Sequence, residues 1–90
     1  MKLVFSPSAW DDYLFWQAKD RATLSRINEL IKDAGRSPFV GIGKPEPLSG
    51  ELKGWWSRRI TREHRLVYRV RGTGEEQALE IASCRFHYGR

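Results

Sequence analysis

A glutamate, two arginines and a histidine–tyrosine pair stand out as side chains that could work together chemically: Glu46, Arg59, Arg65, His87 and Tyr88. A glutamate can remove a proton, arginines can bind a phosphate with paired N–H groups, and a histidine can protonate a leaving group. These are the groups needed for metal-free RNA cleavage, in which a ribose 2′-hydroxyl attacks the neighbouring phosphate. Each residue alone is more often an ordinary exposed side chain. The set is therefore a hypothesis that requires the fold to bring them together.

The glutamate lies between two prolines in the stretch 41–48, Gly-Ile-Gly-Lys-Pro-Glu-Pro-Leu. Pro45 restricts the backbone of Lys44 to extended or turn conformations, and Pro47 restricts Glu46 in the same way. A backbone that is already restricted loses little entropy when its carboxylate is fixed. We expect this stretch to be a loop that forms neither a helix nor a regular sheet ladder, with Glu46 as the general base.

Two helices are predicted before this loop. Ser6-Pro7 is a helix start signal, which closes a strand over 2–5 and begins a helix from Pro7 to Ala18. The apolar side of that helix is expected to be formed by Trp10, Tyr13, Leu14 and Gln17, with Phe15 and Trp16 widening the apolar surface. Asp20 can cap a second helix that ends near Gly35. Its apolar stripe is Leu24, Ile27, Leu30, Ile31 and Ala34.

Three strands are predicted after a long irregular segment over 35–54. The apolar period changes to two, which indicates strands over 55–60, 65–71 and 77–86. The last of these breaks the alternation, since Leu79 and Ile81 have one parity and Cys84 the other. Either a bulge or burial of both faces would account for this break.

The alternation on the middle strands separates apolar from charged side chains. Four even-numbered residues are expected to share the buried face: Ile60, Leu66, Tyr68 and Val70. Arg59, Arg65 and Arg69 then lie on the opposite face. If the hairpin keeps this parity, Arg59 and Arg65 lie across the ladder from one another, where like charges are destabilising without an anion. This pair predicts a phosphate site.

The composition is that of a single domain over residues 1–90, with 16 Lys and Arg against 11 Asp and Glu, a formal charge of +5. The positive charge favours nucleic acid over a membrane as partner, although a basic protein with no nucleic-acid role has the same balance. A single cysteine, Cys84, rules out an intrachain disulfide and favours a reducing cytoplasm. The two histidines and Cys84 lack metal-ligand spacing, so we expect neither a metal nor a cofactor.

Six blocks of sequence carry a family resemblance over nearly the whole chain. They are WDDYL from Trp10, INELIKD from Ile27, GKPEPL from Gly43, WSRRIT from Trp56, EHRLVY from Glu63 and CRFHY from Cys84. With these blocks the chain resembles the YoeB (Txe) toxins of bacterial toxin–antitoxin systems, within the RelE-like ribonucleases. The resemblance implies an α+β fold like that of small microbial ribonucleases. Its two N-terminal helices would pack on one face of a mostly antiparallel sheet of four to five strands.

The resemblance also implies an activity and partners. The family's members cut mRNA in the A site of the 70S ribosome, and a YefM-like antitoxin blocks them, with a toxin dimer as one form within the complex. By matching motif, Glu46 would be the general base, with Arg65 and Arg59 stabilising the phosphate. His87 would be the general acid, and Tyr88 would orient the substrate. Further substrate contacts would come from Lys44, Lys53 and Arg85.

Two departures from the family pattern leave a second hypothesis open. Ser49 stands where the family often has a lysine, which Lys44 or Lys53 could replace, and Gly89 and Arg90 follow the tyrosine at which family chains commonly end. A chain altered at these positions could be a non-catalytic basic module that binds RNA or the ribosome. That alternative predicts salt-sensitive binding without cleavage.

Overall fold

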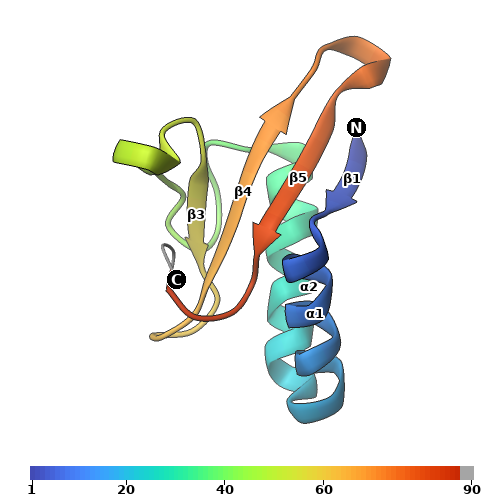
Figure 1. Ribbon diagram of the computed structural model, residues 1–90, viewed down its shortest axis with the longest axis vertical. Helices are drawn as coiled ribbons and strands as arrows, with labels where there is room; N and C mark the ends of the chain where they lie inside the picture. Colours follow the sequence, from blue (N-terminus) through green and yellow to red (C-terminus); the bar gives the residue numbers. More distant parts are fainter. Residues whose placement is uncertain (88–90) are drawn as a thin grey trace.

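Two helices cover one face of a five-stranded sheet in the computed structural model, which describes residues 1–87 (Figure 1). The strand order is β1-β5-β4-β3-β2, and β1 runs parallel to β5 while all other pairs are antiparallel. The elements are β1 (Lys2–Phe5), α1 (Pro7–Lys19), α2 (Arg21–Arg36), β2 (Glu46–Pro47), β3 (Trp56–Arg59), β4 (Arg65–Arg71) and β5 (Ala78–Ser83). The predicted α+β fold, with two helices on one face of a mostly antiparallel sheet, is confirmed.

The helix starts follow the predicted capping residues. The Ser6 hydroxyl accepts the backbone N–H of Ala9 at 3.0 Å, and the Asp20 carboxylate accepts that of Thr23 at 3.1 Å. The backbone bond from Thr23, joined by a bond from its hydroxyl, lowers the pKa of Asp20. The second helix continues through Gly35 and ends at Arg36, one residue beyond the predicted stop.

The predicted apolar side of α1 is only partly confirmed, since Trp16 is buried and Tyr13 and Phe15 are partly buried, whereas that of α2 is largely confirmed. The buried residues of α1 are Ala9, Asp12 and Trp16, while Trp10 and Leu14 are 48% and 40% exposed. An aromatic-rich helix offers several possible stripes, and packing against the sheet selects the one that carries an alanine and a polar residue. On α2, the stripe residues Leu24, Ile27, Leu30 and Ala34 are buried, and Ile31 is partly buried.

The alternation of the middle strands is confirmed. Ile60, Leu66 and Tyr68 join the core formed with the helices, and Val70 packs against it. Val67 and Tyr68 of β4 pair with Ser83 and Ile81 of β5, which leaves Ala82 of β5 as an extra residue. The predicted bulge is therefore present, and the consecutive residues Ala78 and Leu79 are both buried, so both faces are also covered at the start of β5.

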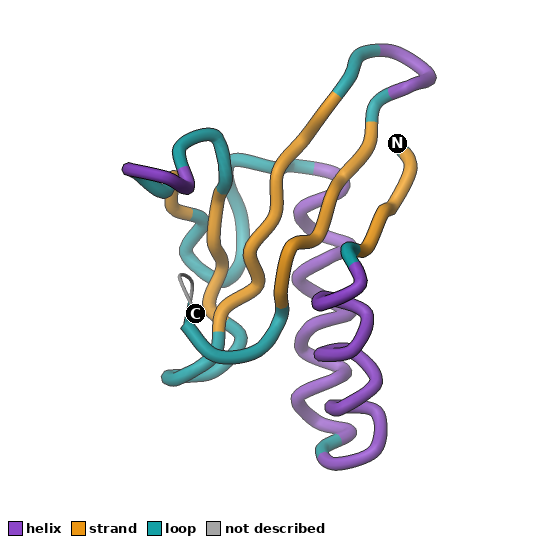
Figure 2. Tube along the Cα trace, viewed as in Figure 1, coloured by secondary structure: helices purple, strands orange, loops and turns teal. Residues whose placement is uncertain are grey.

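The loop before β3 forms a short edge strand, which corrects the expectation that it joins no ladder. Glu46 pairs with Ser57 and Pro47 with Trp56, so these two residues form β2. Proline is compatible with this place because β2 is the last strand of the sheet and needs no further partner. The rest of residues 37–55 is mostly loop, with one short 3₁₀ turn, η1 (Gly50–Leu52) (Figure 2). No helix within residues 1–87 is long and apolar enough to cross a membrane.

Candidate active site

A cavity of about 330 Å³ opens on the sheet face that points away from the helices. Its lining is Lys44, Pro45, Glu46, Pro47, Ser57, Arg59 and Arg65. Four of these residues are charged and were predicted for the site, namely Lys44, Glu46, Arg59 and Arg65. The fold therefore brings the candidate base and both candidate phosphate ligands to one place.

The register of the sheet explains this convergence. Arg59 and Arg65 are direct partners across β3 and β4, as their parity predicted. Glu46 is the partner of Ser57, which lies two residues before Arg59 on the same strand face. Diagonal neighbours of this kind lie about 7–8 Å apart, within reach of long side chains. A carboxylate and two guanidiniums thus share one face at a spacing that allows them to contact a single phosphodiester.

One edge of the Arg65 guanidinium is fixed by the turn between β3 and β4. Its Nη1 donates to the backbone carbonyls of Thr61, Arg62 and His64 at 2.9, 3.1 and 3.1 Å. Within residues 1–87, the Nε and Nη2 groups make no hydrogen bond. The turn therefore orients the guanidinium while leaving its other edge for bidentate binding of an anion.

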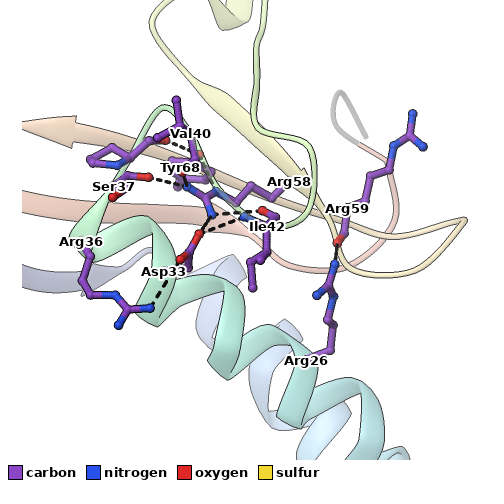
Figure 3. A network of polar contacts seen from close by, with 10 residues as sticks. Arg26, Asp33, Arg36, Ser37, Val40, Ile42, Arg58, Arg59 and Tyr68 are labelled. Carbon is purple, nitrogen blue, oxygen red and sulfur yellow. Dashed lines mark hydrogen bonds and ion pairs between the residues drawn. The ribbon is translucent and has the colours of Figure 1, made fainter.

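The neighbouring Arg58 points to the opposite face of β3 and is fully buried (Figure 3). Its five N–H groups match five hydrogen bonds: Nε to the Tyr68 hydroxyl at 2.9 Å, Nη1 to Asp33 and the Ile42 carbonyl, and Nη2 to the Ser37 and Val40 carbonyls. The bond from Arg58 lowers the pKa of Asp33, assisted by the backbone N–H of Ile42. Burial raises the pKa of Tyr68.

The Arg58 network fixes the loop that carries Lys44 and Glu46. Arg58 donates hydrogen bonds to three backbone carbonyls of this loop, between residues 37 and 42. The carbonyl of the following Gly43 accepts the Arg59 N–H at 2.7 Å. A Cβ on Gly43 would come within 2.7 Å of Leu30, so the close approach of this loop to the core requires glycine. Arg58 was not among the sequence-based candidates, although its even number already placed it on the buried face.

The other predicted site residues are distributed differently. His87 and Arg85 line a second cavity of about 500 Å³, together with Phe15, Trp16, Lys19, Asp20, Glu63, His64 and Phe86. The Arg85 guanidinium lies 3.5 Å from the centre of the Phe15 ring, a cation–π contact. Lys53 lines neither cavity, and Tyr88 lies outside the described residues.

One backbone hydrogen bond links the C-terminal segment, which lines the second cavity, to Arg65 of the first cavity. The Arg65 backbone N–H donates to the Phe86 carbonyl at 3.0 Å, so the segment that carries His87 is bonded to a residue whose side chain lines the first cavity. Among residues 1–87, no group of three His, Cys, Asp or Glu side chains could hold a metal ion.

Comparison with known proteins identifies the family. Residues 5–88 match the family described as the YoeB-like toxin of bacterial type II toxin–antitoxin systems. The chain belongs to the YoeB toxin family. It is 58% identical to Toxin YoeB of Escherichia coli strain K12 over 98% of this chain and 100% of that one. A YoeB/ParE toxin from Agrobacterium tumefaciens is 61% identical, with a TM-score of 0.95 over 98% of this chain and 100% of that chain.

Membership of the YoeB family makes this protein a toxin of a type II toxin–antitoxin system. A relative from Staphylococcus aureus is 45% identical over 98% of both chains. Its structures include a YoeB dimer, with a TM-score of 0.84, and a heterotetrameric YoeB–YefM toxin–antitoxin complex, with a TM-score of 0.86. These relatives match the fold along almost the whole chain.

Proposed function

We propose that this YoeB-family toxin is a ribosome-dependent endoribonuclease that cuts mRNA without a metal. Glu46 removes the proton of a ribose 2′-hydroxyl, and the oxygen attacks the adjacent phosphorus. Arg65 and Arg59 stabilise the negative charge that develops on the phosphoryl oxygens. The bond to the 5′-oxygen breaks, and His87 donates a proton to that leaving oxygen. The products are a 2′,3′-cyclic phosphate and a 5′-hydroxyl.

The observation that carries this proposal is the shared cavity of Glu46, Arg59 and Arg65. A directly opposed arginine pair is unfavourable on its own, and binding of a phosphate would turn that repulsion into attraction. A carboxylate beside such a pair can accept the hydroxyl proton while the arginines contact the phosphate. Lys44 lines the same cavity and would add to the attraction for the RNA backbone.

The proposed acid, His87, lies on the C-terminal segment that is bonded to β4 next to the cavity of Glu46. Phe86 is bonded to the backbone of Arg65, and His87 follows it directly. Tyr88 is proposed to orient the substrate next to His87. Lys53 and Arg85 remain proposed contacts to more distant parts of the RNA, since neither lines the cavity of Glu46.

The proposed partners follow from the family. The complex of the S. aureus relative with YefM supports a YefM-like antitoxin for this chain. The dimer of the same relative supports a toxin pair as one assembly state. The proposed site of action is the A site of the 70S ribosome, which places the activity in the cytoplasm, where mRNA is translated.

The test is primer extension on a translated message, with purified ribosomes and each protein variant. Glu46→Ala should slow cleavage about 10²–10⁴-fold, because a general base is lost. Arg65→Ala should slow it about 10²–10³-fold, because a charge-stabilising donor is lost. Glu51→Ala is the matched control, since Glu51 is exposed on η1 and lies outside the cavity.

The same assay separates catalysis from simple binding. A wild-type protein that binds ribosomes in a salt-sensitive manner without cutting the message would identify a non-catalytic RNA- or ribosome-binding module. A double variant Glu46→Ala, His87→Ala that arrests growth and cuts mRNA as the wild type does would refute the proposed mechanism.

A further inference from the structure

The C-terminal segment makes an unusual turn at Phe86. Its φ of +63° lies in the left-handed region, which residues other than glycine seldom adopt. The side chain is 44% exposed, so burial of its ring does not account for the conformation. A conformation of this kind persists where surrounding contacts hold it in place.

Two hydrogen bonds on either side of Phe86 supply those contacts. Its backbone N–H donates to the Nδ1 atom of His64 at 2.7 Å, and its carbonyl accepts the N–H of Arg65 at 3.0 Å. Both partners come from consecutive residues at the start of β4. Phe86 is therefore held on both sides of its peptide backbone by the turn that also carries the phosphate-binding candidate Arg65.

The imidazole of His64 is itself held by α1. It packs edge-to-face against Trp16, with ring centroids 4.8 Å apart. The same Trp16 donates its indole N–H to the Cys84 carbonyl at 2.8 Å, and the buried Asp12 accepts the Cys84 N–H at 3.0 Å. The start of the C-terminal segment is thus fixed by α1, and its last described turn is fixed by His64.

We infer that His64 is a positioning residue that sets the place of His87 by holding the backbone of Phe86. The inference rests on the proposed function, in which His87 is the general acid. His64 acts through a backbone bond and touches no reacting group. Its loss should therefore reduce the rate of the chemical step while leaving the affinity for ribosomes unchanged.

The bond sets a requirement on the protonation of His64. Nδ1 accepts a hydrogen bond only without a proton, so the neutral imidazole must carry its proton on Nε2. A protonated imidazole would place an N–H donor against the N–H of Phe86 and open the contact. The charged and titratable groups that line the same cavity are Lys19, Asp20, Glu63, Arg85 and His87. Because His87 lies next to Phe86, a pH titration would not report on His64 alone.

The first measurement therefore detects the hydrogen bond directly. In ¹⁵N-labelled wild-type toxin, NMR should show a scalar coupling between the Phe86 amide nitrogen and His64 Nδ1, which exists only across a formed N–H···N bond. The Phe86 amide should also exchange slowly with solvent. Absence of the coupling at a pH where imidazole is neutral would overturn the inference.

The second measurement compares two variants of similar shape. His64→Asn keeps a carbonyl oxygen close to the place of Nδ1, whereas His64→Leu has no acceptor. We expect His64→Leu to accelerate exchange of the Phe86 amide and to slow single-turnover cleavage about tenfold, the effect of one lost hydrogen bond. His64→Asn should restore both. Ribosome affinity and the thermal unfolding temperature serve as controls, since a general loss of structure would change them together.

The outcomes separate this inference from the proposed function. If His64→Leu cleaves mRNA as fast as the wild type while His87→Ala is inactive, the inference is overturned and the proposed function stands. If the wild type shows the coupling but cuts no mRNA, the proposed function is refuted, and the placement of His87 by His64 remains supported.

Discussion

Replacement of Arg58 by methionine tests how this fold holds the loop of Glu46. Methionine has a similar length and fills the buried space, but it has no N–H donors. The variant removes five hydrogen bonds at once, including those to Asp33 and to the Tyr68 hydroxyl. The carbonyls between residues 37 and 42 lose their common partner, so the loop before β2 loses its anchor.

The expected loss of stability follows from the burial of Arg58, whose side chain is 0% exposed while that of Asp33 is 19% exposed. Removal of one partner of a buried ion pair costs about 3–5 kcal/mol. A protein of 90 residues has a free energy of unfolding of about 5–13 kcal/mol, so this is a large share of the total. At about 4–8 °C for each kcal/mol, the melting temperature should fall by about 12 °C or more.

Urea unfolding monitored by tryptophan fluorescence measures this loss of stability. The matched control is Arg59→Met, which makes the same chemical change one residue further along β3 on an exposed side chain. That control should change stability by no more than about 0.5 kcal/mol, while it weakens cleavage. Equal unfolding midpoints for Arg58→Met and Arg59→Met would refute the structural role assigned to Arg58.

Three further predictions concern stability. Gly35→Ala should stabilise the protein by about 0.5–1 kcal/mol in urea unfolding, because Gly35 lies inside α2 with nothing within 4 Å of an added Cβ. Gly41→Ala should destabilise it by about 1–3 kcal/mol, because φ is +125° and the new Cβ would clash with Asp33; an unchanged midpoint would contradict this. The hydrogen bond from Arg58 holds the pKa of Asp33 below its ordinary value, so the contribution of Asp33 to stability is present above that ordinary value and is lost as pH falls through the lowered folded pKa. In Asp33→Asn, the free energy of unfolding should therefore fall less between neutral and acidic pH than it does in the wild type.

Local chemistry in the sequence was sufficient for all the α-helices and strands except β2, and for one part of the site. Ser6, Pro7 and Asp20 marked the helix starts because capping depends on side chains next to the helix end. The two-residue period placed Arg59 and Arg65 opposite one another, because in a hairpin the buried face fixes the register. The conformational restriction of Glu46 followed from its flanking prolines, although its pairing with β3 did not.

Tertiary structure alone decided what holds the site together. The partners of Arg58 come from α2, from the loop after it and from β4, and no spacing rule joins such segments. Likewise, His64 and Phe86 are 22 residues apart in sequence, and their bond exists because β4 and the segment after β5 meet at one turn. Which stripe of α1 is buried was also decided by packing. The sequence by itself determined which groups could do chemistry, because that depends on residue type. The hydrogen bonds that position them were decided by the three-dimensional fold, because these bonds join distant segments.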